Sequence, residues 1–571
     1  MAGGQGAQGG EPFVWKGKTL LSGVNPARLG ERTAAAFPVK DRTLYLCPSP
    51  LYGWGLKLFL ERLEAEAPGS AVLCIEADKE LYELSVKHID GDVLANKKFR
   101  IANIIEAGAL CSFSRQAWGA RIFAQVEQLR LTGGWQLFPQ LYEALAGALR
   151  QDIATDWSNA LTMTRLGYLY IRSAIRNLAL IPRFPSIEHL SFGGDPVFVL
   201  GAGPSMDEAL GELERFFGES LKEPASRPFR IICVDTCLPA LRDRGIVPDL
   251  AVILESQHWN IRDFIGLRGW DVPCAMALSA LPLCAEMLAG PKYLFSTPWA
   301  DLRIFRRLKK AGLLPESVPP LGSVGLCATE IARRLSRGAI VVSGVDLCFT
   351  LDKYHGRSTA GHRDRLAAVT RFSSPLNACA AFAEGIFREL SHDSRPVRCN
   401  PIMRRYRDLF QREFAGDGRS HGHGRLFCME GGGLDLGIEV LSQREAVKVL
   451  AGGSALGKPL GGGGLPEGLE AKLEEFLHGE KKLLLTLRDI LTGDARESAH
   501  LNILIDECDY LWSHFPDYAG GRRPDMQDFL GDPAAALSAQ ARSFLNRLRL
   551  EVDRALALMD RLSERGREGR P

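Results

Sequence analysis

Residues 191–450 show short apolar runs that alternate with stretches of helical periodicity. Six of these runs are predicted strands: PVFVLG from residue 196, RIICVD from 230, LAVIL from 250, PCAMALS from 273, KYLFS from 292 and AIVVSGVD from 339. Strand-forming runs separated by helices of about 10–20 residues are typical of a parallel sheet with helices on both faces. The pattern predicts an α/β fold with a central Rossmann-like, doubly wound and mostly parallel sheet.

A second α/β pattern lies nearer the N-terminus. The run TLYLCPS at 43–49 leads into the helical pattern LKLFLERLEAE and then into a further apolar run, AVLCIEAD at 71–78. Glu76 ends that run, where Rossmann-type proteins place an acid that binds ribose. We therefore expect a Rossmann-like N-terminal domain plus helices over residues 31–190. Residues 1–30 begin with a glycine-rich stretch, and we expect them to be disordered.

Helical periodicity dominates the C-terminal part of the chain. The sequence GGSALGKPLGGGG predicts a glycine-rich linker at 451–466, and residues 467–571 are predicted to be a helical C-terminal region. One predicted apolar helix face is formed by Leu545, Leu548, Val552 and Met559. We expect this region to form a small helical bundle that serves packing, dimerisation or docking of an acceptor.

Composition and charge exclude several classes of protein. The chain has 571 residues, with 70 Lys and Arg against 68 Asp and Glu, so it lacks the basic excess of a nucleic-acid binder. It contains no apolar run long enough for membrane insertion, and its start has no basic segment followed by an apolar one, so we expect no secretion signal. Thirteen cysteines without a CxxC pair favour reduced core thiols and a cytoplasmic location.

Candidate metal ligands are few. The DxD sequence at 90–92 lies in a predicted turn of the N-terminal domain, and His421 and His423 lack an evident third ligand. We therefore predict no metal site.

Polar and small residues follow the predicted strands of the central sheet. Because ligands of doubly wound sheets bind at the carboxyl ends of the strands, these residues are the candidate nucleotide-binding set. They are Gly201, Ala202, Gly203, Ser205, Asp235, Glu255, Ser323, Ser343, Gly344 and Asp346. The turn GAGPS at 201–205 is the most informative of them. Its glycines let the backbone approach a ligand, Pro204 begins a helix, and the helix N-terminus and the Ser205 hydroxyl suit a phosphate.

Three segments carry a resemblance to a known family: GAGPSMDEAL at 201–210, CVDTCLPALRDRGIVPDLAVILE at 233–255 and GSVGLCATEIARRLSRGAIVVSGVD at 322–346. In order and spacing they resemble the MptE-like domain of motility-associated-factor (Maf) flagellin glycosyltransferases. These enzymes are in turn similar to small bacterial sialyltransferases that use CMP-activated nonulosonic acids. The resemblance implies an MptE-like or sialyltransferase-like catalytic domain at 191–450.

The same resemblance assigns roles to individual residues. It implies that the GAGPS turn contacts the nucleotide, that Asp235 stands where the family has an asparagine, and that Ser343, Gly344 and Asp346 match the family's SGID signature. The family holds the CMP phosphate with two tyrosines. Tyr354 matches the second of them, whereas Cys348 stands in place of the first. His355 and His362 are the candidates for the family's catalytic histidine, so the predicted catalytic residues are His355, Tyr354 and His362.

The leading hypothesis is a glycosyltransferase that moves a pseudaminic- or legionaminic-type nonulosonic acid from its CMP derivative to Ser or Thr of flagellin. It predicts a metal-independent reaction with a histidine base, no cofactor, and the nucleotide-sugar donor and flagellin as partners. Two alternatives stay open: an MptE-like 6-hydroxymethylpterin pyrophosphokinase, and a non-catalytic flagellin-binding protein. The oligomeric state is open as well.

Overall fold

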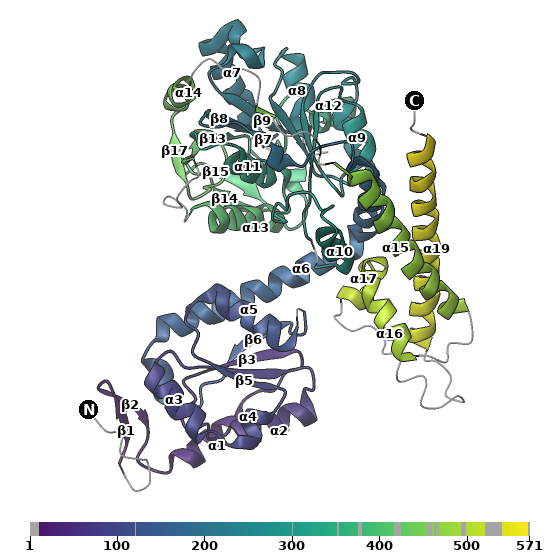
Figure 1. Ribbon diagram of the computed structural model, residues 1–571. Helices are drawn as coiled ribbons and strands as arrows, with labels where there is room; N and C mark the ends of the chain where they lie inside the picture. The colour runs from purple at the N-terminus through teal and green to yellow at the C-terminus, as the bar shows by residue number, and fades with distance from the viewer. Residues whose placement is uncertain are drawn as a thin grey trace. The chain divides into compact units, whose positions relative to one another are not determined.

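The computed structural model (Figure 1) describes residues 11–568 except 120, 300, 351–352, 375–379, 416–423, 454–459, 462–464, 466, 493–497 and 520–538. The chain divides into two compact units. Unit 1 comprises residues 1–165 and 513–524, and unit 2 comprises 166–512 and 525–571. The division falls inside one long helix, α6 (Pro139–Asn177), and not at the expected boundary near residue 190. His421, His423 and most of the predicted linker lie outside the described residues.

Unit 1 is built on a four-stranded parallel sheet with the order β5-β4-β3-β6. The strands are β3 (Thr43–Pro48), β4 (Ala71–Ile75), β5 (Phe99–Ala102) and β6 (Gln125–Gln128). The helices are α1 (Pro26–Ala36), α2 (Leu56–Glu66), α3 (Lys79–His88), α4 (Gly91–Ala95), α5 (Ala107–Trp118), the first part of α6, and α18 (Pro516–Ala519). All residues of β3 and β4 are buried, as expected for parallel strands covered on both faces. The Rossmann-like prediction for this domain is confirmed.

Of the residues that were expected to be disordered, 1–30, the structure describes 11–30, and these contain two strands and the start of α1. Strands β1 (Phe13–Trp15) and β2 (Lys18–Leu21) form a hairpin that packs at the carboxyl end of the unit 1 sheet. A Cβ added at Gly133, which follows β6, would lie 2.9 Å from the Thr19 carbonyl oxygen. The hairpin therefore covers the edge at which such a sheet binds ligands.

Glu76 lies beneath this edge and is fully buried. Its carboxylate accepts a hydrogen bond from the Ser49 hydroxyl at 2.6 Å, and the Tyr142 hydroxyl lies 3.4 Å away. Burial raises the pKa of Glu76 to about 7. The expected ribose-binding acid is thus a core group held by internal partners.

Unit 2 contains an eight-stranded parallel sheet with the order β12-β11-β10-β9-β8-β13-β16-β17. Its strands are β8 (Val197–Leu200), β9 (Arg230–Val234), β10 (Leu250–Ile253), β11 (Cys274–Ala277), β12 (Lys292–Phe295), β13 (Ile340–Ser343), β16 (Leu426–Met429) and β17 (Glu439–Leu441). The six predicted strands are confirmed. Strands β16 and β17 were not predicted; they are short, with four and three residues, and no helical pattern sets them off as clearly as the six predicted strands.

Helices cover both faces of this sheet. Helix α11 (Val324–Leu335) packs on β8, β9, β10 and β13, whereas α7 (Ser205–Phe217) and α14 (Gln443–Ala451) pack together beside β13, β16 and β17. Because the crossover connections between parallel strands are right-handed, α11 lies on one face of the sheet and α7 and α14 lie on the other. The remaining helices around the sheet are α8 (Leu238–Asp243), α9 (Pro282–Glu286), α10 (Arg303–Lys310), α12 (Ala360–Ala367) and α13 (Pro401–Phe410). Two short pairings complete the unit: β14 (Phe387–Leu390) with β15 (Pro396–Cys399), and β7 (Leu190–Ser191) with β18 (Leu460–Gly461).

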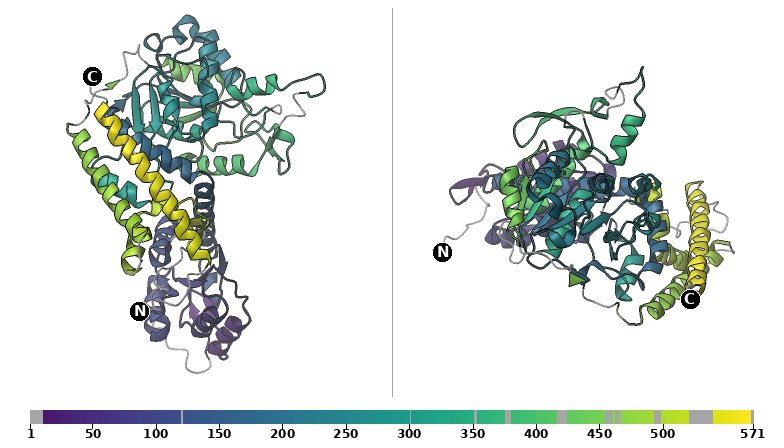
Figure 2. Two further views of the ribbon diagram at one scale, coloured as in Figure 1. Left: turned by 90° about the vertical axis from the view of Figure 1, so that its right-hand side faces the viewer. Right: turned by 90° about the horizontal axis from the view of Figure 1, so that it is seen from above.

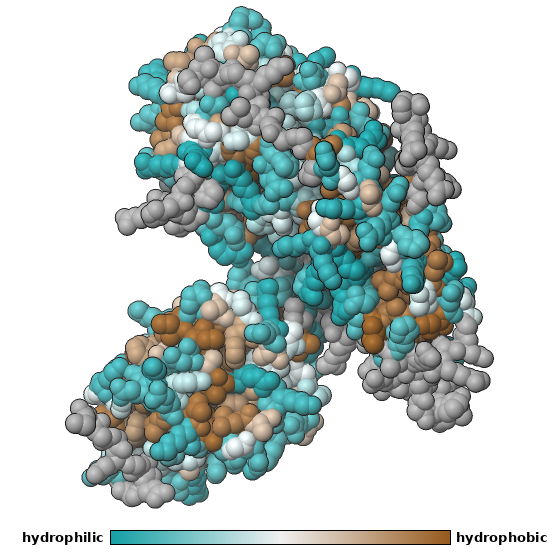
Figure 3. All heavy atoms as spheres, in the orientation of Figure 1, coloured by the Kyte–Doolittle hydropathy of each residue, from teal (hydrophilic) through white to brown (hydrophobic). Residues whose placement is uncertain are grey.

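The C-terminal residues that the structure describes are helical, as predicted. Helices α15 (Leu469–Thr492) and α19 (Ala539–Glu568) lie side by side, with α16 (Ser498–Glu507) and α17 (Asp509–Trp512) next to them (Figures 1 and 2). Leu548, Val552 and Met559 of the predicted apolar face are fully buried. Hydrophobic side chains also gather on the surface in the region of these helices (Figure 3). Exposed hydrophobic residues of α15 and α16 are Leu485 and Ile503. Among the described residues, no helix combines the length and apolar character that crossing a bilayer requires.

Candidate functional site

The candidate site lies where the strand order of the unit 2 sheet reverses. From β8 the chain proceeds to β9 on one side, whereas β13 pairs with β8 on the other side and continues to β16. Doubly wound sheets bind ligands outside the carboxyl ends of the two strands at such a point. The turn 201–205 follows β8 and the turn 343–346 begins at the end of β13, so the two strongest predicted motifs meet at this edge.

The two turns interlock through their glycines. The Gly201 N–H donates to the Ser343 carbonyl at 2.8 Å, and the Gly203 N–H donates to the Gly344 carbonyl at 2.7 Å. A Cβ at Gly201 would lie 2.3 Å from the Gly344 oxygen, and a Cβ at Gly344 would lie 2.1 Å from the Gly201 oxygen. Gly344 also has a φ of +71°, in the left-handed region. These glycines are therefore required by the close approach of one turn to the other.

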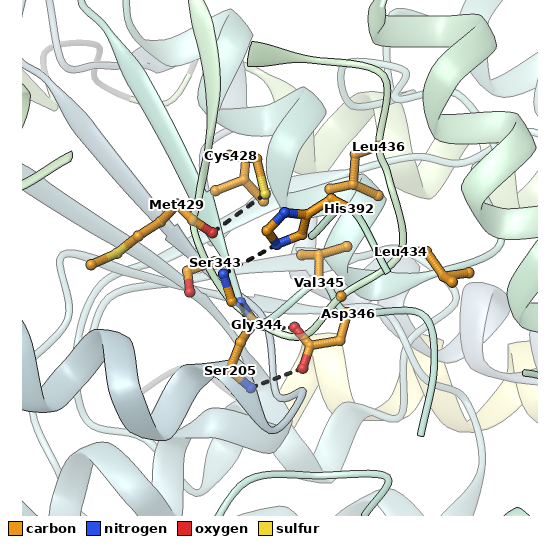
Figure 4. A pocket seen from close by; sticks show the side chains of 13 residues that line it. Ser205, Ser343, Gly344, Val345, Asp346, His392, Cys428, Met429, Leu434 and Leu436 are labelled. Atoms are coloured by element: carbon orange, nitrogen blue, oxygen red, sulfur yellow. Dashed lines mark hydrogen bonds between the residues drawn. The ribbon is translucent and has the colours of Figure 1, made fainter. Parts of the chain in front are cut away.

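Ser205 and Asp346 join the turns at the start of α7 (Figure 4). The Ser205 N–H donates to Asp346 Oδ2 at 2.8 Å, its hydroxyl donates to Asp346 Oδ1, and the Gly344 N–H donates to Ser205 Oγ at 3.0 Å. Burial raises the pKa of Asp346. An internal carboxylate thus occupies the helix N-terminus where the sequence predicts a phosphate, and a phosphate bound there would have to displace it.

His392 is a neighbour of this pair that the sequence analysis did not single out. It follows β14 and reaches a small cavity of about 10 Å³, enough for about one water, that Ser205, Ser343 and Asp346 also line (Figure 4). Its Nε2 accepts a hydrogen bond from the Gly431 N–H at 3.2 Å. No local motif marks this histidine, because the surrounding residues come from β13 and from the segment after β16.

The predicted catalytic loop crosses the first turn. The Gly356 N–H donates to the Ala202 carbonyl at 2.9 Å, and the Arg357 N–H donates to Asp207 Oδ1 at 3.0 Å. A Cβ at Gly356 would lie 2.6 Å from Met206 Cε, so the loop is tightly packed there. The structure therefore places the predicted loop directly on the GAGPS turn.

This docking places Tyr354 and His355 beside the turn. Their rings are tilted against each other, with centroids 4.2 Å apart and an angle of 43° between the planes, and Tyr354 is 49% exposed. Burial lowers the pKa of His355 to about 4, so its ring is neutral at neutral pH. His362 lies in the first turn of α12, and burial also lowers its pKa. Its Nδ1 is buried without a hydrogen-bond partner among the described residues.

A cluster of carboxyl groups follows β9 and β10. Asp235 is 1% exposed and accepts hydrogen bonds from Asn260 Nδ2 and from the Thr236 N–H, both at 2.9 Å. Burial raises its pKa to about 6, and nearby Glu255 contributes to the rise. Burial and the charge of Asp235 raise the pKa of Asp263 to about 7. Asp263 and Asn260 lie in a 3₁₀ segment, His258–Phe264, and the sequence analysis missed them because no strand precedes them directly.

The other predicted residues lie near the same edge. Ser323 is the N-cap of α11, but its side chain makes no capping hydrogen bond. The Ser343 hydroxyl is buried and has no partner among the described residues. Cys348, by contrast, is a core residue whose Sγ lies 3.3 Å from the Gly432 carbonyl oxygen. In the described part of the chain, no group of three or more His, Cys, Asp or Glu side chains is placed to hold a metal ion, and Asp90 caps α4.

Residues 172–352 match the model of the family described as 6-hydroxymethylpterin diphosphokinase MptE-like. This segment is similar to the MptE-like family. The fold of the whole chain is similar to that of a MAf glycosyltransferase from Magnetospirillum magneticum AMB-1. The TM-score is 0.51 at 14% identity, over 96% of this chain and 90% of that one. The chain is also 27% identical to an uncharacterized protein of Treponema pallidum (strain Nichols), over 97% of this chain and 94% of the relative.

The segment matched by the MptE-like model contains both interlocked turns and the carboxyl cluster. Tyr354, His355, His362 and His392 all lie beyond its last matched residue. The candidate site is therefore built partly from this matched segment and partly from the loop and strand pair that follow it.

Proposed function

We propose that this protein is a glycosyltransferase that transfers a pseudaminic- or legionaminic-type nonulosonic acid from its CMP derivative to a Ser or Thr hydroxyl of flagellin. One observation carries the proposal: a loop with Tyr354 and His355 is docked across the turn at the strand-order reversal of a doubly wound sheet. The fold shared with a MAf glycosyltransferase supports the same reaction class. The motif resemblance to CMP-dependent sialyltransferases supports the finer choice of donor.

In the proposed reaction, the acceptor oxygen attacks the anomeric carbon of the sugar. A new carbon–oxygen bond forms, the bond between the sugar and the phosphate oxygen breaks, and CMP leaves. Tyr354 donates its hydroxyl proton in a hydrogen bond to the departing phosphate, which stabilises the developing charge without a metal ion. Asp235 and Glu255 accept hydrogen bonds from ribose hydroxyls or from the cytosine amine. Ala202, Ser323 and Ser343 lie at the same edge and complete the proposed nucleotide site.

The proton of the acceptor hydroxyl goes to a histidine. His355 is neutral at neutral pH, so its ring has a nitrogen lone pair available, although a pKa of about 4 makes it a weak base. His362 is the second candidate, because its buried Nδ1 has no partner among the described residues. Both histidines lie on the loop and helix that follow Tyr354.

A second candidate function is a 6-hydroxymethylpterin diphosphokinase, the activity in the description of the matching family. The match to that family favours it. Such an enzyme would need carboxylates near the strand ends to hold magnesium and ATP. Asp235 and Asp263 both interact electrostatically with Glu255, but among the described residues no group of three or more His, Cys, Asp or Glu side chains is placed to hold a metal ion.

Calorimetry separates these functions. The unaltered protein is titrated with CMP, CMP-N-acetylneuraminate and ATP, each with Mg²⁺ and with EDTA. Binding of the two CMP ligands in EDTA supports the glycosyltransferase. Binding of ATP alone, only with Mg²⁺, contradicts it and supports the kinase.

Transfer to the acceptor is tested separately, with purified flagellin, a CMP-activated nonulosonic acid and intact-protein mass spectrometry. A mass increase by one sugar residue supports the proposed reaction. Binding of flagellin without any mass increase, although donor binds, favours the non-catalytic flagellin-binding alternative.

A further inference from the structure

A third glycine turn, at residues 431–433, follows β16 and packs against the two interlocked turns. Its three glycines are buried, and none of them has a left-handed φ. A Cβ at Gly431 would lie 2.6 Å from Ser205 Cβ, and a Cβ at Gly433 would lie 3.0 Å from Asp346 Cα. These glycines are therefore needed for close contact and not for an unusual backbone conformation. The contact is with the two residues that join the other turns.

Hydrogen bonds fix the middle and the end of this turn to the segment after β13. The Leu434 N–H, directly after the glycines, donates to the Asp346 carbonyl at 2.9 Å. The Thr350 hydroxyl donates to the Gly432 carbonyl at 3.0 Å, and a Cβ at Gly432 would lie 2.5 Å from Thr350 Cγ2. The start of the turn needs a different partner, because these bonds leave its first N–H unused.

His392 bonds to both ends of the glycine turn. The Gly431 N–H donates to His392 Nε2 at 3.2 Å (Figure 4), and the His392 N–H donates to the Gly433 carbonyl at 3.0 Å. The His392 ring also lines the same small cavity as Ser205 and Asp346. Because the lone pair of Nε2 accepts the Gly431 N–H, this nitrogen cannot take up a proton while the bond persists. The geometry therefore fits a role in holding the turn.

The turn between β14 and β15 holds His392 itself in place. The Ser391 N–H donates to the Arg395 carbonyl at 2.9 Å, and the Arg395 N–H donates to the Ser391 hydroxyl at 3.0 Å. Asp393 forms an ion pair with Arg395 at 2.5 Å. Ser391 also pairs with Leu434 in an antiparallel bridge. These contacts close the turn around His392 and direct it to the glycines.

We propose that His392 is a positioning residue of the candidate site. Through the 431–433 turn it holds Ser205 and Asp346, and with them both interlocked turns, in place. The proposal goes beyond the choice of donor, because it concerns the geometry of the site under either candidate function. It gives a role to two segments, the β14–β15 turn and residues 431–433, that lie beyond the segment matched by the MptE-like model.

Hydrogen–deuterium exchange of the full chain, followed by mass spectrometry, tests the proposal. His392→Leu keeps a side chain of similar size but leaves the Gly431 N–H without an acceptor. His392→Gln is the conservative variant, because its side-chain oxygen can accept that bond. His189→Leu is the matched control. His189 is a half-buried histidine of the same unit, in a 3₁₀ segment beside β12, at the other edge of the sheet from β16 and β17.

We expect His392→Leu to exchange about 5- to 150-fold faster in peptides that cover 201–206, 343–346 and 431–434, the effect of one buried N–H left unpaired. Strands β9 to β11 should exchange as in the unaltered protein, and His392→Gln and His189→Leu should keep the original rates. Unchanged exchange in His392→Leu would overturn the proposal. Faster exchange throughout the sheet would overturn it too, because it indicates general destabilisation, as would equally fast exchange in His392→Gln.

Calorimetry with CMP on the same variants separates this proposal from the proposed function. Weaker CMP binding by His392→Leu, but not by His392→Gln, shows that the turns held by His392 bind the nucleotide. Faster exchange at the turns with unchanged CMP affinity supports the role of His392 and contradicts a nucleotide site at these turns. If the unaltered protein does not bind CMP, the donor proposal fails, and the exchange result alone decides the role of His392.

Discussion

The interlocked turns at the candidate site make Gly344 a position where even a methyl group should destabilise the protein. Replacing it by alanine adds one methyl group, whose carbon would lie 2.1 Å from the Gly201 oxygen and 2.6 Å from the Gly201 carbonyl carbon. Both neighbours are backbone atoms, so no side-chain rotation can relieve the contact. The two turns would have to separate, which strains the hydrogen bond from the Gly203 N–H to the Gly344 carbonyl.

The expected loss of stability has two parts. Placing alanine at a φ of +71° costs about 1–2 kcal/mol, because the Cβ approaches the following carbonyl. Forcing a methyl group into a fully packed contact costs about 1–3 kcal/mol more. We therefore expect Gly344→Ala to lower the free energy of unfolding by about 2–5 kcal/mol.

Gly193→Ala is the matched control. Gly193 belongs to the same unit and has a φ of +60°, but a Cβ there would meet no atom within 4 Å. It should cost only the strain of the left-handed backbone, about 1–2 kcal/mol. Urea denaturation followed by tryptophan fluorescence gives the change in the free energy of unfolding for both variants. If Gly344→Ala and Gly193→Ala destabilise the protein equally, the two turns are not interlocked and the proposed architecture of the site is wrong.

Three further predictions concern the reaction and the carboxyl cluster. Sugar transfer should persist in excess EDTA; complete loss, restored by Mg²⁺ or Mn²⁺, would contradict the metal-independent mechanism and favour the diphosphokinase. If His355 or His362 is the base, its replacement by alanine should lower the transfer rate by about 10²–10⁴-fold while CMP still binds, and wild-type rates in both variants would exclude this loop as the source of the base. The pKa of Asp263 is raised from 3.8 to about 7, so its contribution to stability is present at pH 4 and is lost as the pH rises through 7. Asp263→Asn should therefore raise the denaturation midpoint at pH 8 relative to the unaltered protein and leave it nearly unchanged at pH 4; equal changes at both pH values would refute this.

The sequence was sufficient to predict the layout of the central domain. A parallel strand buried on both faces needs a continuous apolar run, so β8 to β13 are each visible as a local pattern. The carboxyl ends of parallel strands lie at one edge, so residues such as Ser205, Asp235 and Asp346 could be assigned to one site before any distance was known. The helical nature of the C-terminal region followed from its periodicity in the same way.

Only the tertiary structure showed what these residues contact. The sequence analysis interpreted Gly201 and Gly203 as a cradle for phosphate, whereas they pack against the turn at Gly344. It treated Ser205 and Asp346 as separate ligand groups, whereas they bond to each other. A glycine can be needed because a ligand approaches the backbone or because a neighbouring turn does. The sequence cannot distinguish the two cases, since in both of them a Cβ would occupy the required space.

The tertiary structure also decided which distant segments complete or close each site. The β1–β2 hairpin covers the ligand edge of the unit 1 sheet, and Glu76 becomes a core group beneath it. His392, which no strand pattern marks, lines the same cavity as Ser205 and Asp346. The periodicity of apolar residues shows which face of a single helix or strand is buried. The contacts between these distant segments depend instead on how whole helices and strands pack against one another. The sequence therefore determined the helices and strands and the sheet edge at which the candidate residues lie. Packing between elements that are distant in the sequence determined which side chains contact one another at that edge.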